Sequence, residues 1–90
     1  MTAKQVQYGG RVQGVGFRYT VKRLAGGFEV VGCVRNLEDG SVELQAMAQD
    51  EEELEAFLQA IRESSLAGNI KSVVESSIPP LAGVKQFNIA

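Results

Sequence analysis

The stretch Tyr8–Thr20, "YGGRVQGVGFRYT", marks the point at which the hydrophobic pattern of the chain changes. Before it, polar and apolar residues alternate weakly over Lys4–Val12, which is typical of a half-buried strand. After it, apolar residues recur at i, i+4, i+7 and i+8 from Phe17 to Ala25, the spacing of one helix face. Gly26 and Gly27 offer the helix a stop. The stretch therefore predicts a strand, a glycine-rich turn and a helix.

The remaining segments read as strands and one further helix. We predict strands over 28–36 and 41–49 around an Asp-Gly hairpin turn, a helix over 50–64, and strands over 70–76 and 84–90. Asp50 and Glu53 resemble a capping box at the start of that helix. The order β-α-β-β-α-β with a short extra C-terminal strand is the ferredoxin-like split βαβ arrangement of the α+β class. We expect a mainly antiparallel sheet with two helices on one face, in a single free-standing domain over residues 1–90.

The composition of the chain argues against several classes of function. The 90-residue chain has a net charge of −2, which argues against broad affinity for nucleic acid or anionic membranes. No apolar run approaches the about 18–20 residues of a membrane span. The single cysteine, Cys33, rules out an internal disulfide, so we expect a cytoplasmic protein, and from its size a monomer, with Cys33 in the core. Because histidine is absent, Ser-His-Asp and Cys-His sites are excluded.

The glycine-rich stretch fails the two common nucleotide-loop motifs. Gly14 and Gly16 supply half of the Rossmann fingerprint, but Tyr19 occupies its third glycine position. A P-loop needs a Gly-Lys pair, and the chain has none. An RNA-recognition module, which shares the fold, needs exposed aromatic residues on its central strands, and 41–49 has none.

An anion site remains. Unpaired amides and the positive dipole end at the start of a helix attract anions, and Gly14 and Gly16 would let a ligand come close to the backbone. Arg18 in the first helical turn is a cation at the end where the dipole disfavours it, which suggests a role beyond stability. The alternative, a solvated arginine beside a simple turn, is about as well supported. Asn36 ends the next parallel strand at the same sheet edge, although an asparagine that starts a hairpin turn is common.

Two motifs resemble those of the acylphosphatase family. Residues Gly10–Arg18 match Gly-x-Val-Gln-Gly-Val-x-Phe-Arg at every specified position. Residues 32–42 fit a second motif of the form Gly-aromatic-small-x-Asn, three residues, Gly-x-Val, except that Cys33 replaces the aromatic residue. The glycine usual after the third strand is also missing, and "QAMAQDEEE" (45–53) leads us to expect a bulge or a longer turn there.

The resemblance implies hydrolysis of an acyl phosphate, a small-molecule substrate, without a metal or other cofactor. It implies that Arg18 and the backbone amides of Gln13, Gly14, Val15, Gly16 and Phe17 hold the phosphoryl group. It also implies that Asn36 orients the attacking water. The alternative is a non-catalytic phosphate- or carbamoyl-phosphate-binding module of the same fold, as found within larger maturation enzymes.

Overall fold

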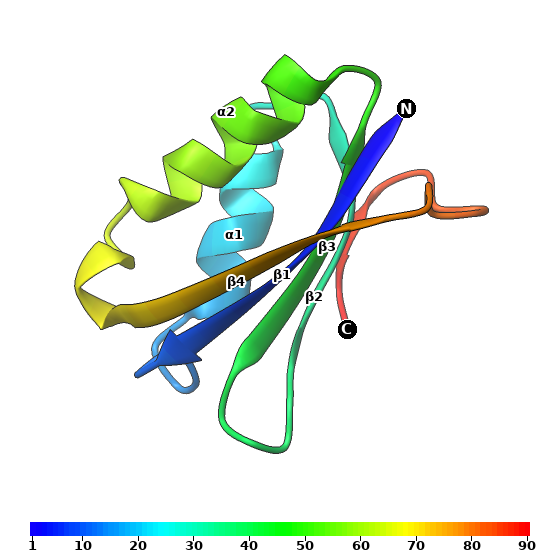
Figure 1. Cartoon of the computed structure of the whole chain (residues 1–90). Coiled ribbons are helices and arrows are strands. Elements are labelled where there is room, and N and C mark those ends of the chain that lie inside the picture. Colours follow the sequence, from blue (N-terminus) through cyan, green and yellow to red (C-terminus); the bar gives the residue numbers. More distant parts are fainter.

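A computed structural model describes the whole chain, Met1–Ala90, as one sheet with two helices on one of its faces (Figure 1). The elements are β1 (Thr2–Gly10), α1 (Phe17–Ala25), β2 (Val30–Asn36), β3 (Val42–Ala48), α2 (Glu51–Arg62), the 3₁₀ turn η1 (Ala67–Asn69), β4 (Ile70–Ile78) and β5 (Phe87–Ile89).

The strand order β4-β1-β3-β2-β5 confirms the ferredoxin-like α+β fold. The pairs β1–β3, β1–β4 and β2–β3 are antiparallel. The short β5 lies parallel to β2 at the sheet edge. With β3 between them, β1 and β2 run in the same direction, so their carboxyl ends lie at the same end of the sheet. The loop after β1 and the hairpin after β2 are therefore brought together.

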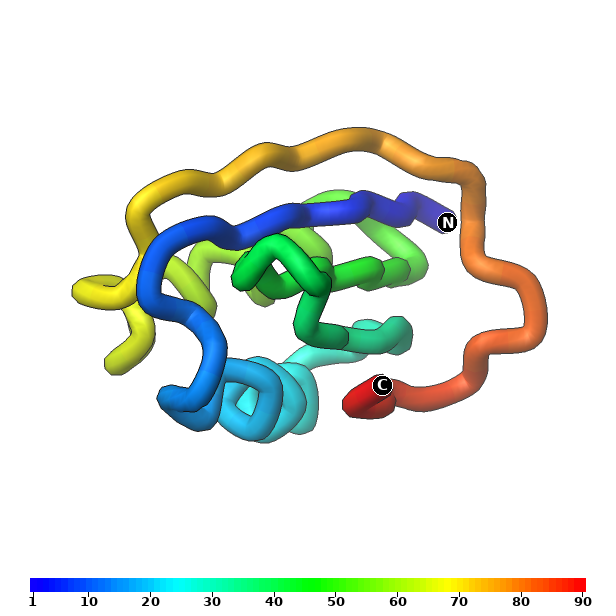
Figure 2. Tube along the Cα trace, turned by 90° about the horizontal axis from the view of Figure 1, so that it is seen from below, coloured from blue at the N-terminus to red at the C-terminus, as the bar shows by residue number.

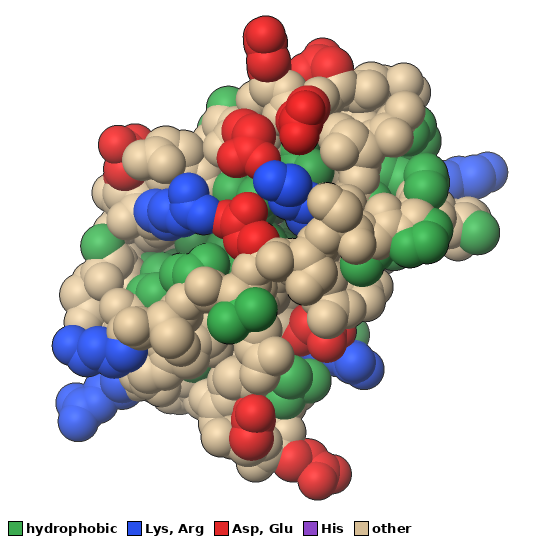
Figure 3. All heavy atoms as spheres, viewed as in Figure 1, with side chains coloured by type: hydrophobic (Ala, Val, Ile, Leu, Met, Phe, Trp, Pro, Cys, Tyr) green, Lys and Arg blue, Asp and Glu red, His purple; other side chains and the backbone are tan.

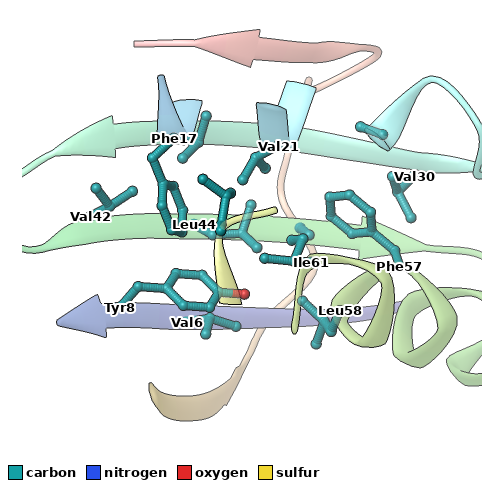
Figure 4. Close-up of a cluster of buried hydrophobic side chains, with 14 of the residues drawn as sticks. Val6, Tyr8, Phe17, Val21, Val30, Val42, Leu44, Phe57, Leu58 and Ile61 are labelled. Carbon is teal, nitrogen blue, oxygen red and sulfur yellow. The ribbon is translucent and has the colours of Figure 1, made fainter. Parts of the chain in front are cut away.

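The main core lies between the helices and the sheet (Figure 4). Alternate residues of the strands point into it, and Val6, Val34, Val42 and Leu44 have no exposed surface. The helices contribute residues at helical spacing, and those of α2 are Leu54, Phe57, Leu58 and Ile61. This burial of aliphatic and aromatic side chains supplies most of the driving force for folding.

The other face of the sheet is mostly open and polar, and the expectation for Cys33 was wrong. Because Val30, Gly32 and Val34 point to the helices, Cys33 points the other way and is half-buried, paired in register with Gln45. Residues 79–86 cross this face between β4 and β5 (Figure 2), and the Leu81 amide donates a hydrogen bond to Met47 Sδ. Only the end of the face under this segment is well covered.

Two further details differ from the sequence-based prediction. Strand β1 ends at Gly10 and does not reach Val12, which is buried in the following loop. Strand β3 contains no bulge: its pairing with β1 runs one-to-one from Tyr8↔Val42 to Thr2↔Ala48, and only Gln49 and Asp50 separate it from α2. The segment 45–53 therefore contains neither a bulge nor a long turn.

Gly32 of the second motif is required by close packing. It has φ 149°, and a Cβ atom at this position would lie 1.9 Å from the carbonyl oxygen of Gln45 on β3. Any side chain here would push β2 away from β3.

Ion pairs connect α2 to the two strands beneath it. Lys4 on β1 pairs with Glu55 on α2 and with Glu75 on β4, and Arg62 on α2 also pairs with Glu75. The hydrogen bond to Glu55 and both carboxylates raise the pKa of Lys4. Acidic and basic side chains are mixed on the face shown in Figure 3, without a broad basic area. Neither helix is long and apolar enough to cross a membrane.

Candidate functional site

A cavity of about 100 Å³ lies at the end of the sheet where β1 and β2 finish. It is lined by residues from the glycine-rich loop, the first turn of α1 and the last residue of β2: Val12, Gly14, Gly16, Phe17, Arg18, Tyr19 and Asn36. The split βαβ topology thus unites the two motifs.

The loop that forms the cavity depends on glycine. Gly14 and Gly16 have φ angles of 76° and 77°, in the left-handed region where a side chain costs about 1–2 kcal/mol per residue. Gly16 is also the N-cap of α1, and its carbonyl oxygen accepts the first helical hydrogen bond, from the Thr20 amide at 3.0 Å. No side chain caps this helix, and its first turn holds no acidic residue. The start of α1 is therefore open to a ligand.

The backbone amides of this region are free. No amide hydrogen from Val12 to Tyr19 is donated to another group of the protein, whereas the Arg11 amide before them bonds Asn69 O at 3.0 Å. Amides without partners in a loop that leads into a helix N-terminus form an anion-binding arrangement. Backbone amides without a protein partner cost the least free energy when they are open to water or to an anion.

Phe17 fixes the start of the helix to the sheet. Its ring is buried, and its centroid lies 5.1 Å from that of Tyr8 on β1 at a tilt of 52°. This contact holds the loop between β1 and α1 at both of its ends. Burial also raises the pKa of the Tyr8 hydroxyl far above its ordinary value, so Tyr8 stays neutral and serves packing.

Arg18 pairs with no Asp or Glu side chain. The four ion pairs of the protein use Lys4, Arg35 and Arg62 as cations, and the guanidinium of Arg18 donates only to the main-chain oxygen of Ala90, the last residue of the sequence, at 3.2 Å. That contact orients the side chain at the cavity. A guanidinium with free N–H groups beside unpaired amides is suited to holding a phosphoryl group.

Asn36 is exposed at the end of β2, and its side chain makes no hydrogen bond within the protein. The hairpin turn is closed without it, by the Leu37 amide, which donates to Ser41 O at 2.9 Å, and by Ser41, which donates to Asp39. Those bonds from Ser41 also lower the pKa of the Asp39 carboxyl. The side-chain amide of Asn36 is thus free to face the cavity.

The structure also gives Gln13 a role that sequence reasoning missed. Its side-chain amide donates to two carbonyl oxygens of the hairpin turn, Leu37 O at 2.8 Å and Ser41 O at 2.9 Å. These bonds tie the glycine-rich loop to the turn that follows Asn36. The partners are 24 and 28 residues away along the chain, so no local sequence pattern predicts these bonds.

Of the predicted site residues, the structure brings together Gly14, Gly16, Phe17, Arg18 and Asn36 around the cavity. Gln13 and Val15 do not line it, although their amides are free like those of their neighbours. No group of three or more His, Cys, Asp or Glu side chains is placed to hold a metal ion.

Comparison with known proteins agrees with this geometry. The family model for acylphosphatase matches residues 4–89. The chain belongs to the acylphosphatase family. An acylphosphatase of Listeria welshimeri is 46% identical over 81 residues, covering 89% of this chain and 86% of that protein. The crystal structure of an acylphosphatase from Bacillus subtilis superposes with a TM-score of 0.89 at 33% identity, over 100% of this chain and 99% of that one.

A larger protein contains the same fold. The crystal structure of HypF from T. kodakarensis superposes with a TM-score of 0.82 at 31% identity. The match covers 100% of this chain and 12% of HypF. The fold therefore occurs both as most of an acylphosphatase and as a small part of a larger protein.

Proposed function

We propose that the protein is an acylphosphatase that hydrolyses the carboxyl-phosphate bond of small acyl phosphates by metal-free, in-line attack of water. The observation that carries the proposal is the cavity at which Arg18, Asn36 and a run of unpaired amides meet. Membership of the acylphosphatase family supports the same activity.

In this mechanism, the free amides of Gln13 to Phe17 and the guanidinium of Arg18 bind the phosphoryl oxygens. They are already oriented by the loop and by the contact with Ala90, so little reorganisation is needed as charge develops. The side-chain amide of Asn36 holds a water molecule against the phosphorus. Catalysis then consists mainly of positioning and charge stabilisation, as expected for a loose phosphoryl-transfer transition state.

The hydrolysis needs no histidine to transfer protons. The water oxygen forms a bond to phosphorus, while the bond from phosphorus to the acyl oxygen breaks and its electron pair leaves with the carboxylate. A carboxylate is the base of a fairly strong acid, so it departs without a general acid. The proton of the water passes to a phosphate oxygen of the substrate. The products are a carboxylate and inorganic phosphate.

The second candidate is a module that binds phosphate or carbamoyl phosphate without hydrolysing it. The structural match to a segment of HypF favours this candidate, because that segment is part of a larger protein. The same cavity serves both candidates, and only turnover separates them.

Phosphate release from benzoyl phosphate in the presence of EDTA is the deciding experiment. We expect the wild-type chain to turn over, and the Arg18→Ala variant to lose most of that turnover while keeping its fold by circular dichroism. Binding of inorganic phosphate without any hydrolysis would support the binding module. Activity that disappears with EDTA and returns with a divalent metal would contradict the metal-free mechanism.

We further propose that residues 1–90 act as one domain, as a cytoplasmic monomer that binds neither nucleic acid nor membranes. The lone cysteine suits a reducing compartment. Light scattering of the purified chain tests the oligomeric state, and a dimer mass would contradict it.

A further inference from the structure

Tyr19 is exposed to an extent that the fold does not explain. Its exposed fraction is 78%, higher than that of any other large apolar side chain, and the next, Met1, has 65%. It takes no part in the aromatic contacts of the core, and its hydroxyl makes no hydrogen bond with the protein. Of the exposed large apolar residues, which also include Val15 and Val74, Tyr19 alone lines the cavity.

The cavity is small for a pocket that encloses a whole substrate. Its volume of about 100 Å³ lies below the range of roughly 300–1,000 Å³ typical of pockets that bury a small molecule. With the phosphoryl group against the free amides and Arg18, the acyl group extends toward the mouth of the cavity, where it meets the side chains around the rim.

The geometry of the reaction separates the acyl group from Asn36. In-line displacement places the attacking water and the leaving carboxylate on opposite sides of the phosphorus. Asn36, the residue that would hold the water, is on β2, whereas Tyr19 is on the first turn of α1, next to Arg18. An aromatic ring beside the phosphate-binding guanidinium is therefore available to the acyl side of the substrate.

We propose that Tyr19 is a specificity-determining residue that contacts the acyl group and favours acyl phosphates with an aromatic or other broad apolar group. This inference rests on the proposed acylphosphatase function. The ring of Tyr19 can stack on an aromatic acyl group or cover an apolar one, while its hydroxyl stays in water. The acyl group makes this contact both before and during bond cleavage, so it lowers KM more than it raises kcat.

The test compares benzoyl phosphate with acetyl phosphate as substrates of the wild type, Tyr19→Ala and Tyr19→Phe. For Tyr19→Ala we expect the ratio of kcat/KM for benzoyl to acetyl phosphate to fall by about three- to tenfold, mainly through KM. Tyr19→Phe should keep the wild-type ratio, because it keeps the ring. Val74→Ala, which removes an exposed apolar side chain on β4 away from the cavity, is the matched control and should also keep it.

Inhibition by inorganic phosphate provides the second readout. Its inhibition constant should be the same in Tyr19→Ala and in the wild type, because phosphate lacks the acyl group. An equal loss for both substrates, or a weaker phosphate inhibition, would show that Tyr19 supports the site in general and would overturn the inference while the proposed function stands. A wild type that hydrolyses neither substrate would overturn both.

Discussion

Helices α1 and α2 begin with opposite chemistry. The N-cap of α2, Asp50, accepts a hydrogen bond from the Glu53 amide at 2.8 Å, and its first turn carries three glutamates. The N-cap of α1, Gly16, has no side chain to cap the helix, and the first turn carries Arg18 and no acidic residue. The start of α2 satisfies its own amides and dipole, as a stable helix requires. The start of α1 leaves both unsatisfied, which favours the binding of an anion.

The start of α2 matches its predicted local motif only in part. Asp50 and Glu53 were predicted to form a capping box, and the half made by Asp50 is confirmed. The carboxylate of Glu53 does not reach back to the Asp50 amide and instead accepts a hydrogen bond from the Glu29 amide at 2.8 Å. The start of α2 is thus also tied to the segment that enters β2.

Replacing the cation at the open helix start should have the largest effect. We expect Arg18→Ala to lower kcat/KM for benzoyl phosphate by about 10²–10³-fold, since it removes preorganised charge from the phosphoryl site. Thermal unfolding should change little, because Arg18 pairs with no Asp or Glu side chain. Arg23→Ala, in the last turn of the same helix, is the control and should retain activity. If both variants were equally active, the cation at the start of α1 would not contribute to catalysis.

Asn36→Ala separates water positioning from anion binding. We expect kcat to fall by about 10²-fold, the scale at which misplaced reactants cost rate. The inhibition constant for inorganic phosphate should stay close to that of the wild type, because the amides and Arg18 remain. The fold should be unaffected, since the side chain of Asn36 makes no hydrogen bond within the protein. Weakened phosphate inhibition would instead make Asn36 part of the anion site.

An acidic residue like the cap of α2 can be introduced into α1 as Gly16→Asp. A Cβ atom at Gly16 meets no heavy atom within 4 Å, so the cost comes from the left-handed backbone and from the charge. Gly16→Asn has the same shape without the charge. We expect kcat/KM of the aspartate variant to lie about tenfold or more below that of the asparagine variant, because the carboxylate repels the phosphoryl group. Equal activity in the two variants would mean that no anion binds at this helix start.

The smallest effect is expected at α2, and on stability alone. Asp50→Ala should lower the free energy of unfolding by about 1 kcal/mol, the usual value of an N-cap. For a domain of this size that corresponds to a fall in Tm of about 4–8 °C, measured by thermal unfolding. Asp50→Asn should lose less, as asparagine caps nearly as well. The kcat/KM for benzoyl phosphate should not change in either variant, and a loss there would connect α2 to the site.

Sequence patterns determined the order of the elements, because the periods of strands and helices are local and depend on which residues face the core. They also located the glycine-rich loop and its unfavourably placed arginine. The alternation of Val30, Gly32 and Val34 also indicates that Cys33 faces away from the helices, since neighbouring strand residues face opposite ways. The prediction of a core cysteine followed its apolar character and overlooked that alternation.

Only the tertiary structure decided what surrounds the loop. The contact of Arg18 with Ala90 and the bonds from Gln13 to the hairpin turn both join segments far apart in the chain. The parallel placement of β5 beside β2 and the crossing of the open face by residues 79–86 bring the last residues to the site. Such contacts depend on how the strands are ordered in the sheet, and periodicity carries no information about that order.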